Sequence, residues 1–333
     1  MHMLFLKGTF LLGCMLGGVE ASSRMPAFFD HKAYSDCMAS PSYFHPHVEG
    51  GKPACEASHF TRISKLGSGA SSLVFSATVS DATLEENSSL PKVVALKEIV
   101  GRKYFEQAHN EKCLLIASNH PNVPKLFCMY EERGMVVLIM ELVEGCTISQ
   151  ALQGQSRLSP AAVQSRWMDV LTTGLSVLQY YHDNGIVLRD LKPENVILNM
   201  VEGKLHTTFV DFGVSGKICS NPRKPWQGTR YCWPPEYFEW EVNCELTFPI
   251  QNESADFYAL GIVLLSLTTG KLPFANANKY TLKREIRTAS WKRDLLAGAV
   301  QNELLEGLLR TPSAERFNHS KVLEWIREKN NTL

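Results

Sequence analysis

The sequence predicts an α+β fold in two parts: a small β-sheet with one helix, followed by a larger helical region. Short runs rich in β-branched residues, which favour strands, occur between residues 60 and 142. Beyond Gly145 the apolar residues recur at helical spacing instead. The chain has 333 residues, of which 44% are hydrophobic, so it can bury a large core.

The first 21 residues have the pattern of a secretory signal peptide. Lys7 precedes an apolar stretch from Gly8 to Val19, and the small residues Val19 and Ala21 predict cleavage after Ala21. A buried N-terminal strand or an uncleaved anchor is the alternative. We therefore expect the protein to enter the secretory pathway and to be secreted. Residues 22–58 predict a loop-rich N-terminal extension.

Cysteine usage is consistent with an oxidising route. Of nine cysteines, removal of Cys14 with the signal leaves eight, an even number that still allows 105 full pairings. We expect Cys37 to pair with Cys55. Cys113 and Cys128 lie in apolar stretches, where we expect them to act as small buried hydrophobes. Candidates for a second pair are three cysteines of the C-terminal half: Cys219, Cys232 and Cys244.

The predicted strands come before the predicted helices. The strand candidates are residues 63–69, 72–79, 93–100, 125–130 and 135–142. Between the third and the fourth, residues 103–118 carry apolar or small residues at helical spacing, which predicts a helix. Arg133-Gly134 predicts a hairpin turn.

Two long helices are predicted in the second part. One starts at Pro160, after the N-cap Ser159, and ends at Asn184-Gly185. The other, residues 255–270, is apolar nearly all round, which predicts a helix buried in the core.

The charges balance, with 34 Lys plus Arg against 34 Asp plus Glu. A net charge of zero gives no whole-molecule reason to expect nucleic acid as a partner, and we expect none. No run of 18 or more apolar residues occurs, so we expect no integral membrane segment after removal of the signal.

A glycine-rich turn and a lysine among apolar residues are the first candidate functional features. Leu66-Gly67-Ser68-Gly69 joins the first two strands and could bring backbone N–H groups to phosphate oxygens, or it could be an ordinary hairpin loop. Lys97 lies among apolar residues of the third strand, where it needs a partner. Glu111 on the following helix is the natural one, and the pair could clamp phosphates or be structural.

The strongest signal is Leu-Arg-Asp-Leu-Lys-Pro-Glu-Asn at residues 188–195, followed by Asp-Phe-Gly at 211–213. Asp190 could orient and deprotonate a hydroxyl group. Asp211 and Asn195 offer the hard oxygen ligands that Mg²⁺ prefers. Lys192 could neutralise charge on a transferring phosphoryl group. Any single Asp could instead be a helix cap, but the whole set in this order is too specific for chance.

With these motifs, the chain resembles the eukaryotic protein kinase family from about residue 60 to residue 328. A lysine at position 192, two residues after Asp190, resembles the pattern of the serine/threonine kinases within this family. The resemblance implies a two-lobed fold: a five-stranded antiparallel N-lobe with one helix at residues 59–142, and a larger helical C-lobe at 143–333. It also implies that ATP and Mg²⁺ bind between the lobes and that a protein, not yet identified, is the substrate.

The resemblance further implies a role for each matching residue. Asp190 would be the catalytic base, assisted by Lys192. Asn195 and Asp211 would bind the metal. Residues that would bind or surround the nucleotide are Leu66, Gly67, Ser68, Gly69, Val74, Ala95, Lys97, Glu111, Met140, Glu141, Val143 and Ile197. Arg316 looks like the buried ion-pair partner of Glu236.

Three positions depart from the family pattern: Ser72 replaces the third glycine, Leu188 a histidine, and Pro234 an alanine. None of them removes a catalytic group, so we expect an active kinase. A pseudokinase that binds nucleotide or a partner as a scaffold is the alternative. Ser215 and Ser220 are candidate acceptors for a phosphate that would pair with Arg189. The alternative is that the basic residues of this segment simply attract acidic substrates.

A looser resemblance links the signal, the cysteine-bearing extension and the divergent motifs to the rhoptry kinases that apicomplexan parasites inject into host cells. It implies a secreted effector kinase that travels through a secretory organelle. We expect the protein to be a monomer.

Overall fold

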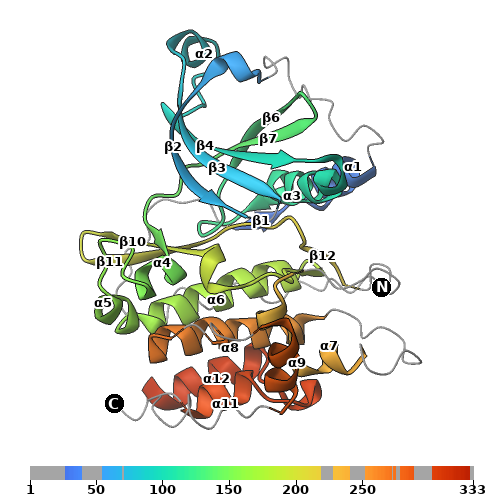
Figure 1. The fold of residues 1–333 in the computed structure, drawn as a ribbon, viewed down its shortest axis with the longest axis vertical. Coiled ribbons are helices and arrows are strands. Elements are labelled where there is room, and N and C mark those ends of the chain that lie inside the picture. The colour runs from blue at the N-terminus through green and yellow to red at the C-terminus, as the bar shows by residue number, and fades with distance from the viewer. Residues whose placement is uncertain are drawn as a thin grey trace, which may run out of the picture.

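The computed structural model arranges the chain in two lobes, one above the other (Figure 1). The described residues are 27–39, 55–69, 71–218, 228–240, 252–271, 273–274, 278–288 and 302–330. The expected signal peptide, together with Cys14, Cys219, Ser220 and Cys244, lies outside these ranges. The upper lobe holds the large sheet and the lower lobe most of the helices, so the α+β two-lobed fold is confirmed.

Five antiparallel strands form the sheet of the upper lobe, in the order β2-β3-β4-β7-β6. They are β2 (Phe60–Ser68), β3 (Ser72–Val79), β4 (Val93–Val100), β6 (Leu126–Glu132) and β7 (Met135–Met140). A short helix, α2 (Asp81–Glu86), lies between β3 and β4. The predicted hairpin between β6 and β7 is confirmed. It turns at Arg133 and Gly134, with φ of 51° and 73°, and glycine adopts that region without strain.

Helix α3 (Phe105–Ala117) is the helix predicted between the third and fourth long strands. It packs against the sheet, and its Leu114 and Leu115 are buried in one core with Val136 and Leu138 of β7. Glu111 on the same helix is only 1% exposed. A carboxylate so deeply buried requires a charged or hydrogen-bonding partner, and this requirement fixes how α3 can face the sheet.

The lower lobe is helical. Its helices are α4 (Ile148–Leu152), α5 (Pro160–Gln164), α6 (Trp167–His182), α7 (Pro235–Trp240), α8 (Glu253–Thr269), α9 (Lys279–Thr288), α11 (Asn302–Leu308) and α12 (His319–Asn330). The single helix predicted from residue 160 is divided into α5 and α6. The hydroxyl of Ser165 donates to the carbonyl of Ala162 at 2.9 Å, and such local bonds compete with the helix ladder.

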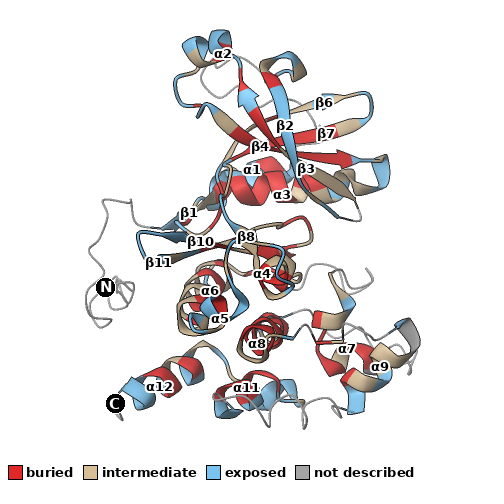
Figure 2. Ribbon diagram, turned by 60° about the vertical axis from the view of Figure 1, so that its left-hand side comes forward, coloured by how far each residue is buried: buried red, intermediate tan, exposed pale blue. Residues whose placement is uncertain are grey.

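Helix α8 is the all-apolar helix, and it lies at the centre of the lower lobe with its sides buried (Figure 2). It ends at Gly270, whose φ of 69° gives the left-handed cap that glycine favours. The predicted core helix is therefore confirmed. Among the described helices, none combines the length and the apolar character needed to cross a bilayer.

Short strands at the top of the lower lobe shape the loops of the candidate site. They are β8 (Cys146–Thr147), β9 (Ile186–Val187), β10 (Val196–Val201), β11 (Lys204–Phe209) and β12 (Gly216–Lys217). β10 pairs with β8 and β11, and β12 pairs with β9, all antiparallel. The loop between β9 and β10 and the segment between β11 and β12 are each held at both ends by these ladders.

The N-terminal extension is more ordered than the sequence indicates. It contains a strand, β1 (Phe28–Phe29), and a helix, α1 (His31–Ala39), which lies beside α3 in Figures 1 and 2. β1 pairs with β5 (Ser118–Asn119), directly after α3. The expectation of loop structure is therefore wrong for residues 28–39. Tertiary packing on α3 orders a segment that has little helical pattern of its own.

Two disulfides tie the extension to the upper lobe, with a connectivity that differs from the expectation. The bonds are Cys37–Cys113, whose Cα atoms are 5.4 Å apart, and Cys55–Cys128, at 6.1 Å. The expected Cys37–Cys55 pair is wrong, as is the expectation that Cys113 and Cys128 are free. Each extension cysteine bonds to a cysteine more than 70 residues away because the extension folds back onto the sheet and α3. Cys146 and Cys232 carry free thiols.

The loop after α3 joins the two lobes. The side chain of Asn122 donates to the carbonyl of Thr207 at 2.7 Å, and the N–H of Phe209 donates to the carbonyl of Asn122 at 2.9 Å. Next to it, the ring of His120 contacts Ser176 on α6 at 3.1 Å and accepts the N–H of Asn122 at 3.2 Å. Burial lowers the pKa of His120 to about 4, so its imidazole is neutral in the folded protein at neutral pH.

This buried histidine predicts a loss of stability in mild acid. The pKa of His120 is about 4 in the folded state and near 6.5 in the unfolded chain, so the unfolded chain binds the proton first. The free energy of unfolding should fall as the pH drops from about 6.5 to about 4, by up to about 1.4 kcal/mol per pH unit from this group. In urea unfolding across this pH range, the free energy of unfolding should depend less steeply on pH for His120→Gln than for the wild type. The exposed control His206→Gln should match the wild type, and equal slopes for all three proteins would contradict the prediction.

Candidate active site

Three ionisable side chains from three separate elements meet between the lobes. Lys97 comes from β4, Glu111 from α3, and Asp211 from the segment after β11. The Lys97 ammonium donates to both Glu111 oxygens, at 2.7 and 2.6 Å, and to Oδ1 of Asp211 at 2.7 Å. The sequence predicted the pair of Lys97 with Glu111. The structure adds Asp211 and so connects the sheet, the helix and the lower lobe.

The charges of this cluster depend on each other. Burial works to lower the pKa of Lys97, but the carboxylates of Asp211 and Glu111 outweigh it and raise the pKa. Burial works to raise the pKa of Asp211, but Lys97 outweighs it and holds that pKa below its ordinary value. For Glu111 the balance differs: burial raises its pKa, although the ammonium 2.6 Å away opposes the shift. We assign Glu111 as ionised because Lys97 is held charged beside it.

The carboxylate of Asp190 is held from three sides. Lys192 donates to its Oδ2 at 2.6 Å, and the backbone N–H of Thr229 donates to its Oδ1 at 2.7 Å. The side chain of Asn195 donates to the Asp190 carbonyl at 2.9 Å and to Oδ2 at 3.2 Å. Lys192 also donates to the hydroxyl of Thr229 at 2.8 Å, and the Asp190 carboxylate outweighs burial in raising the pKa of Lys192. The predicted pair of Asp190 and Lys192 is therefore in direct contact.

The loop that carries Asp190 is anchored on the core helix α8. Asp256 accepts the backbone N–H of Leu188 at 2.8 Å and that of Arg189 at 2.9 Å. Nε2 of His182, in the last turn of α6, contacts the same carboxylate at 2.8 Å. Arg189 has a φ of 68°, which a non-glycine residue adopts only when its surroundings impose it. The sequence did not point to His182, because nothing in its local pattern shows that Asp256, 74 residues later, would be beside it.

Asn195 and Asp211 form a donor set that fits Mg²⁺. The N–H of Val210 donates to the carbonyl of Asn195 at 2.9 Å, which brings the two residues together. The amide nitrogen of Asn195 is engaged by Asp190, so its amide oxygen is the atom left for a cation. A carboxylate and an amide oxygen are both hard ligands, and Mg²⁺ commonly binds through one or two protein oxygens and substrate phosphates.

The remaining predicted nucleotide residues lie on both lobes. In the upper lobe, Ala95 pairs with Met140 and Val74 with Lys97 across neighbouring strands, while Leu66 is 43% exposed. In the lower lobe, half-buried Ile197 lies on β10.

The glycine-rich turn and the hinge complete this set. Gly67, Ser68 and Gly69 lie at the end of β2, and the Gly69 N–H donates to the carbonyl of Ser72 at 2.8 Å. Glu141 and Val143 follow β7. The Glu141 N–H donates to the carbonyl of Lys125 at 2.8 Å, which leaves the Glu141 carbonyl and the backbone of Val143 as the candidates for adenine.

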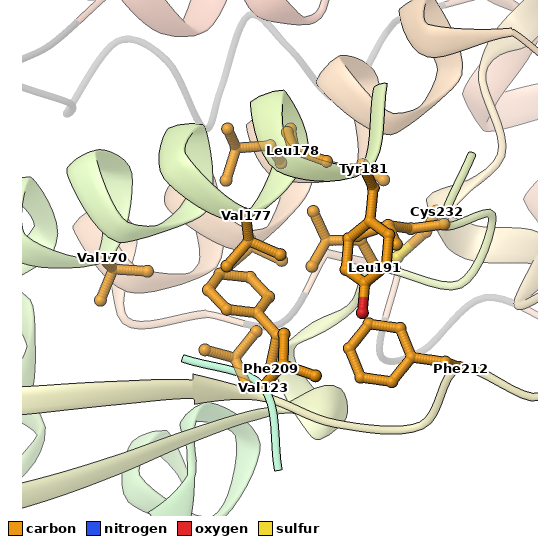
Figure 3. Close-up of a cluster of buried hydrophobic side chains, with 14 of the residues drawn as sticks. Val123, Val170, Val177, Leu178, Tyr181, Leu191, Phe209, Phe212 and Cys232 are labelled. Carbon is orange, nitrogen blue, oxygen red and sulfur yellow. The ribbon is translucent and has the colours of Figure 1, made fainter. Parts of the chain in front are cut away.

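Phe212 is held by a tyrosine that the sequence did not single out. It is 2% exposed, and its ring centroid lies 5.4 Å from that of Tyr181 on α6 (Figure 3). The Tyr181 hydroxyl contacts the hydroxyl of Ser118 at 3.0 Å, after α3. Leu188 is buried in the same core. The only sequence signal for Tyr181 was its place three residues after Leu178 on the apolar face of the helix.

Ser215 is not placed to accept a phosphate. It is 2% exposed, and its hydroxyl donates to the carbonyl of Leu188 at 2.9 Å. Arg189, the expected phosphate partner, donates to the carbonyls of Val214 at 3.3 Å and Lys217 at 2.9 Å. The candidacy of Ser215 is therefore wrong in this arrangement: a side chain that binds the catalytic loop is buried by that contact.

The predicted ion pair of Arg316 with Glu236 is present. The guanidinium binds both carboxylate oxygens of Glu236, each at 2.9 Å, and also the carbonyl of Ser254 at 3.0 Å. Arg316 is 3% exposed. This forked contact fastens α7, which follows Thr229, to α8 and the C-terminal helices.

Comparison with known proteins decides the family. A family model described as the protein kinase domain matches residues 60–325. The chain belongs to the protein kinase family. Among its curated relatives, Protein kinase 2 of Dictyostelium discoideum is 30% identical over 66% of this kinase. Serine/threonine-protein kinase ATG1c of Arabidopsis thaliana is 31% identical over 68%, and human Ribosomal protein S6 kinase alpha-1 is 27% identical over 81%. This kinase covers 43%, 31% and 35% of their lengths, respectively.

The Arg316 contact predicts a large effect on kinase stability. Arg316→Ala removes a fully buried guanidinium and leaves the partly buried Glu236 carboxylate without its ion-pair partner. Breaking a buried pair costs roughly 3–5 kcal/mol of unfolding free energy, and we expect a loss of about 3 kcal/mol here. Arg310→Ala is the matched control. It removes an exposed contact with Glu315 at 3.7 Å, which should cost about 1 kcal/mol or less. Chemical unfolding of both variants measures the difference, and similar small losses would show that the Arg316 pair has no special weight.

Proposed function

We propose that this kinase is catalytically active and transfers the γ-phosphoryl group of ATP, with Mg²⁺, to serine or threonine hydroxyls of a protein substrate. The observation that carries the proposal is the contact of Asp190, Lys192 and Thr229. The Lys192 ammonium and the Thr229 backbone N–H donate to the Asp190 carboxylate at 2.6 and 2.7 Å, and the ammonium also donates to the Thr229 hydroxyl at 2.8 Å. The loop that carries Asp190 is itself anchored on the core helix α8.

In this proposal each residue of the site has a separate role in phosphoryl transfer. The Asp190 carboxylate accepts the proton of the acceptor hydroxyl, and its hydrogen-bond donors Lys192, Thr229 and Asn195 fix its direction. Lys192, which is charged at neutral pH, offsets the negative charge on the phosphoryl group in transfer. Lys97 binds the phosphates of ATP, and Glu111 holds it in place. Mg²⁺, when bound, neutralises phosphate charge, and Asn195 and Asp211 are the residues that would hold it.

The geometry of the site supports an active kinase better than it supports a non-catalytic scaffold. All five residues that the kinase reaction is expected to need are present, in two hydrogen-bonded groups. Lys97 binds Glu111 and Asp211, and Asn195 binds Asp190. Ser72, in place of a glycine, is part of the β3 strand and pairs with Ile99. The serine/threonine class is supported by Lys192 and by the printed names of relatives such as serine/threonine-protein kinase ATG1c.

We further propose that the kinase is secreted. Support comes from the two disulfides, since such bonds persist mainly in oxidising compartments. Its role as a secreted effector belongs to the same proposal. Delivery by an organelle such as the rhoptry stays a prediction from the sequence.

Replacement of the catalytic carboxylate tests the activity. Asp190→Asn should slow phosphoryl transfer by roughly 10²–10⁴-fold, the usual contribution of a positioned general base, and leave ATP affinity nearly unchanged. Transfer from labelled Mg-ATP to a mixed library of Ser, Thr and Tyr peptides measures the rate and the acceptor class. A wild-type protein that binds ATP but labels no peptide would favour the scaffold alternative. Labelling of Tyr peptides alone would contradict the serine/threonine class.

Replacement of the metal ligand tests the role of Mg²⁺. Asp211→Asn keeps the shape of the side chain but removes its charge, so the stabilisation of the protein by ATP should no longer depend on Mg²⁺. Thermal unfolding with ATP, with and without Mg²⁺, measures this effect. The exposed control Asp169→Asn should retain the Mg²⁺ dependence of the wild type. An Asp211→Asn protein that also retained it would exclude Asp211 as a metal ligand.

A further inference from the structure

We propose that Tyr34 and Cys37 of helix α1 are positioning residues for the kinase site: together they hold α3 and residues 211–218, which begin the segment from Asp211 to Glu236 that we call the activation segment. In this arrangement Glu111 and Asp211 reach Lys97. The effect expected on turnover rests on the proposed kinase activity. The effect expected on the structure does not.

The first step is the covalent link between α1 and α3. Cys37 is bonded to Cys113, which is two residues after Glu111 and fully buried. Two residues along a helix are rotated by about 200° and separated by about 3 Å along the axis. Glu111 reaches Lys97 on the sheet side, so Cys113 lies on nearly the opposite side. Helix α3 is therefore held between the sheet and α1, with one anchor on each side.

The extension is also fastened at the C-terminal end of α3. The N–H of Asp30 donates to the carbonyl of Ala117 at 2.9 Å, and β1 pairs with β5. The hydroxyl of Tyr180, on α6 of the lower lobe, donates to the carbonyl of Phe28 at 2.6 Å. Helix α1 therefore starts from a point that is fixed to both lobes, and this point sets where Tyr34 and Cys37 can reach.

Tyr34 extends the same contact to the activation segment. It is 3% exposed, and the Lys217 ammonium of β12 lies 5.6 Å from the centre of its ring. The positive charge of Arg189 acts on the Tyr34 phenol, where burial raises the pKa and Arg189 works to lower it. Arg189 in turn donates to the carbonyl of Lys217 at 2.9 Å. Tyr34 thus packs where the catalytic loop meets the activation segment.

Helix α3 and the activation segment are themselves joined next to Glu111. The side chain of Asn110 donates to the carbonyls of Gly213 at 3.2 Å and of Ser215. Helix α1 contacts both partners of this junction, α3 through Cys37 and β12 through Tyr34. Loss of α1 contacts should let both segments move together, and the ion cluster at Lys97 would then form in only a fraction of the molecules.

The structure supplies a matched control for the disulfide. Cys55–Cys128 also ties the extension to the upper lobe, over a similar separation in sequence of 73 residues against 76. Its Cys128 lies on β6 and belongs to a second core cluster, which contains no residue of α3. The two disulfides close loops of similar length, but only one of them is bonded to α3.

The experiment compares variants of the full chain. The test variants are Tyr34→Ala and the pair Cys37→Ser with Cys113→Ser. The control is the pair Cys55→Ser with Cys128→Ser. Amide hydrogen exchange is followed in residues 105–117 and 211–218, with α8 as the check on global folding. The kcat and KM for a peptide substrate are measured in parallel.

The test variants should exchange faster in both segments while α8 keeps its protection, and kcat should fall by about tenfold or more with little change in peptide KM. A fall in the competent fraction of molecules to about one tenth has this size. Tyr34→Phe, which keeps the ring over Lys217, should restore most of both readouts. The control pair should leave residues 105–117 as in the wild type.

Unchanged exchange in both segments, or an equal effect from the control pair, would overturn the proposal. If Tyr34→Ala lowers the protection of α8, Tyr34→Leu is used as the test variant instead. Unchanged hydrogen exchange in Tyr34→Leu would likewise overturn the proposal. A wild-type protein that transfers no phosphoryl group would refute the proposed activity. Hydrogen exchange would still decide whether α1 positions α3.

Discussion

The Lys97 ammonium is the point on which the arrangement of the two lobes depends. It is 6% exposed, and a lysine charge in that position is stable only when carboxylates surround it. The two that do so come from α3 and from the segment after β11. The sheet therefore cannot keep its lysine buried and charged unless the helix and the lower lobe both approach it. The need to compensate the buried charge of Lys97 therefore fixes the relative positions of β4, α3 and the segment after β11.

A second buried charge organises the lower lobe in the same manner. Asp256 is 1% exposed and accepts two backbone N–H groups of the catalytic loop and a contact from His182. It is carried by α8, the most completely buried of the described helices, so the loop takes its position from the centre of the lower-lobe core. The Asp190 carboxylate then inherits that position through the backbone, and Lys192 and Thr229 only adjust its direction.

The sequence predicted the parts of this arrangement that are encoded locally. Strand runs, the apolar helix at 253–269 and the motifs around Asp190 and Asp211 were all visible, because periodicity and contiguous motifs need no knowledge of the fold. The disulfide partners were not, since Cys37 and Cys113 are 76 positions apart in the sequence and meet only in the folded chain. The break between α5 and α6 coincides with a local hydrogen bond of the Ser165 hydroxyl, and Tyr181 and His182 acquire partners only through tertiary packing. The features that the sequence did not predict were thus mainly contacts between residues far apart in the sequence.

The Leu188 departure lies close to Asp190, at a position where the described contacts of the loop are made by the backbone. The loop is held at this position through the backbone N–H of Leu188, which any residue other than proline supplies. Its carbonyl accepts the Ser215 hydroxyl and joins the loop to the activation segment, again without the side chain. The side chain itself has only to fill a buried space, in which it is 5% exposed. A leucine meets that condition by apolar burial, so replacement of the histidine removes a polar side chain but none of the contacts that position Asp190.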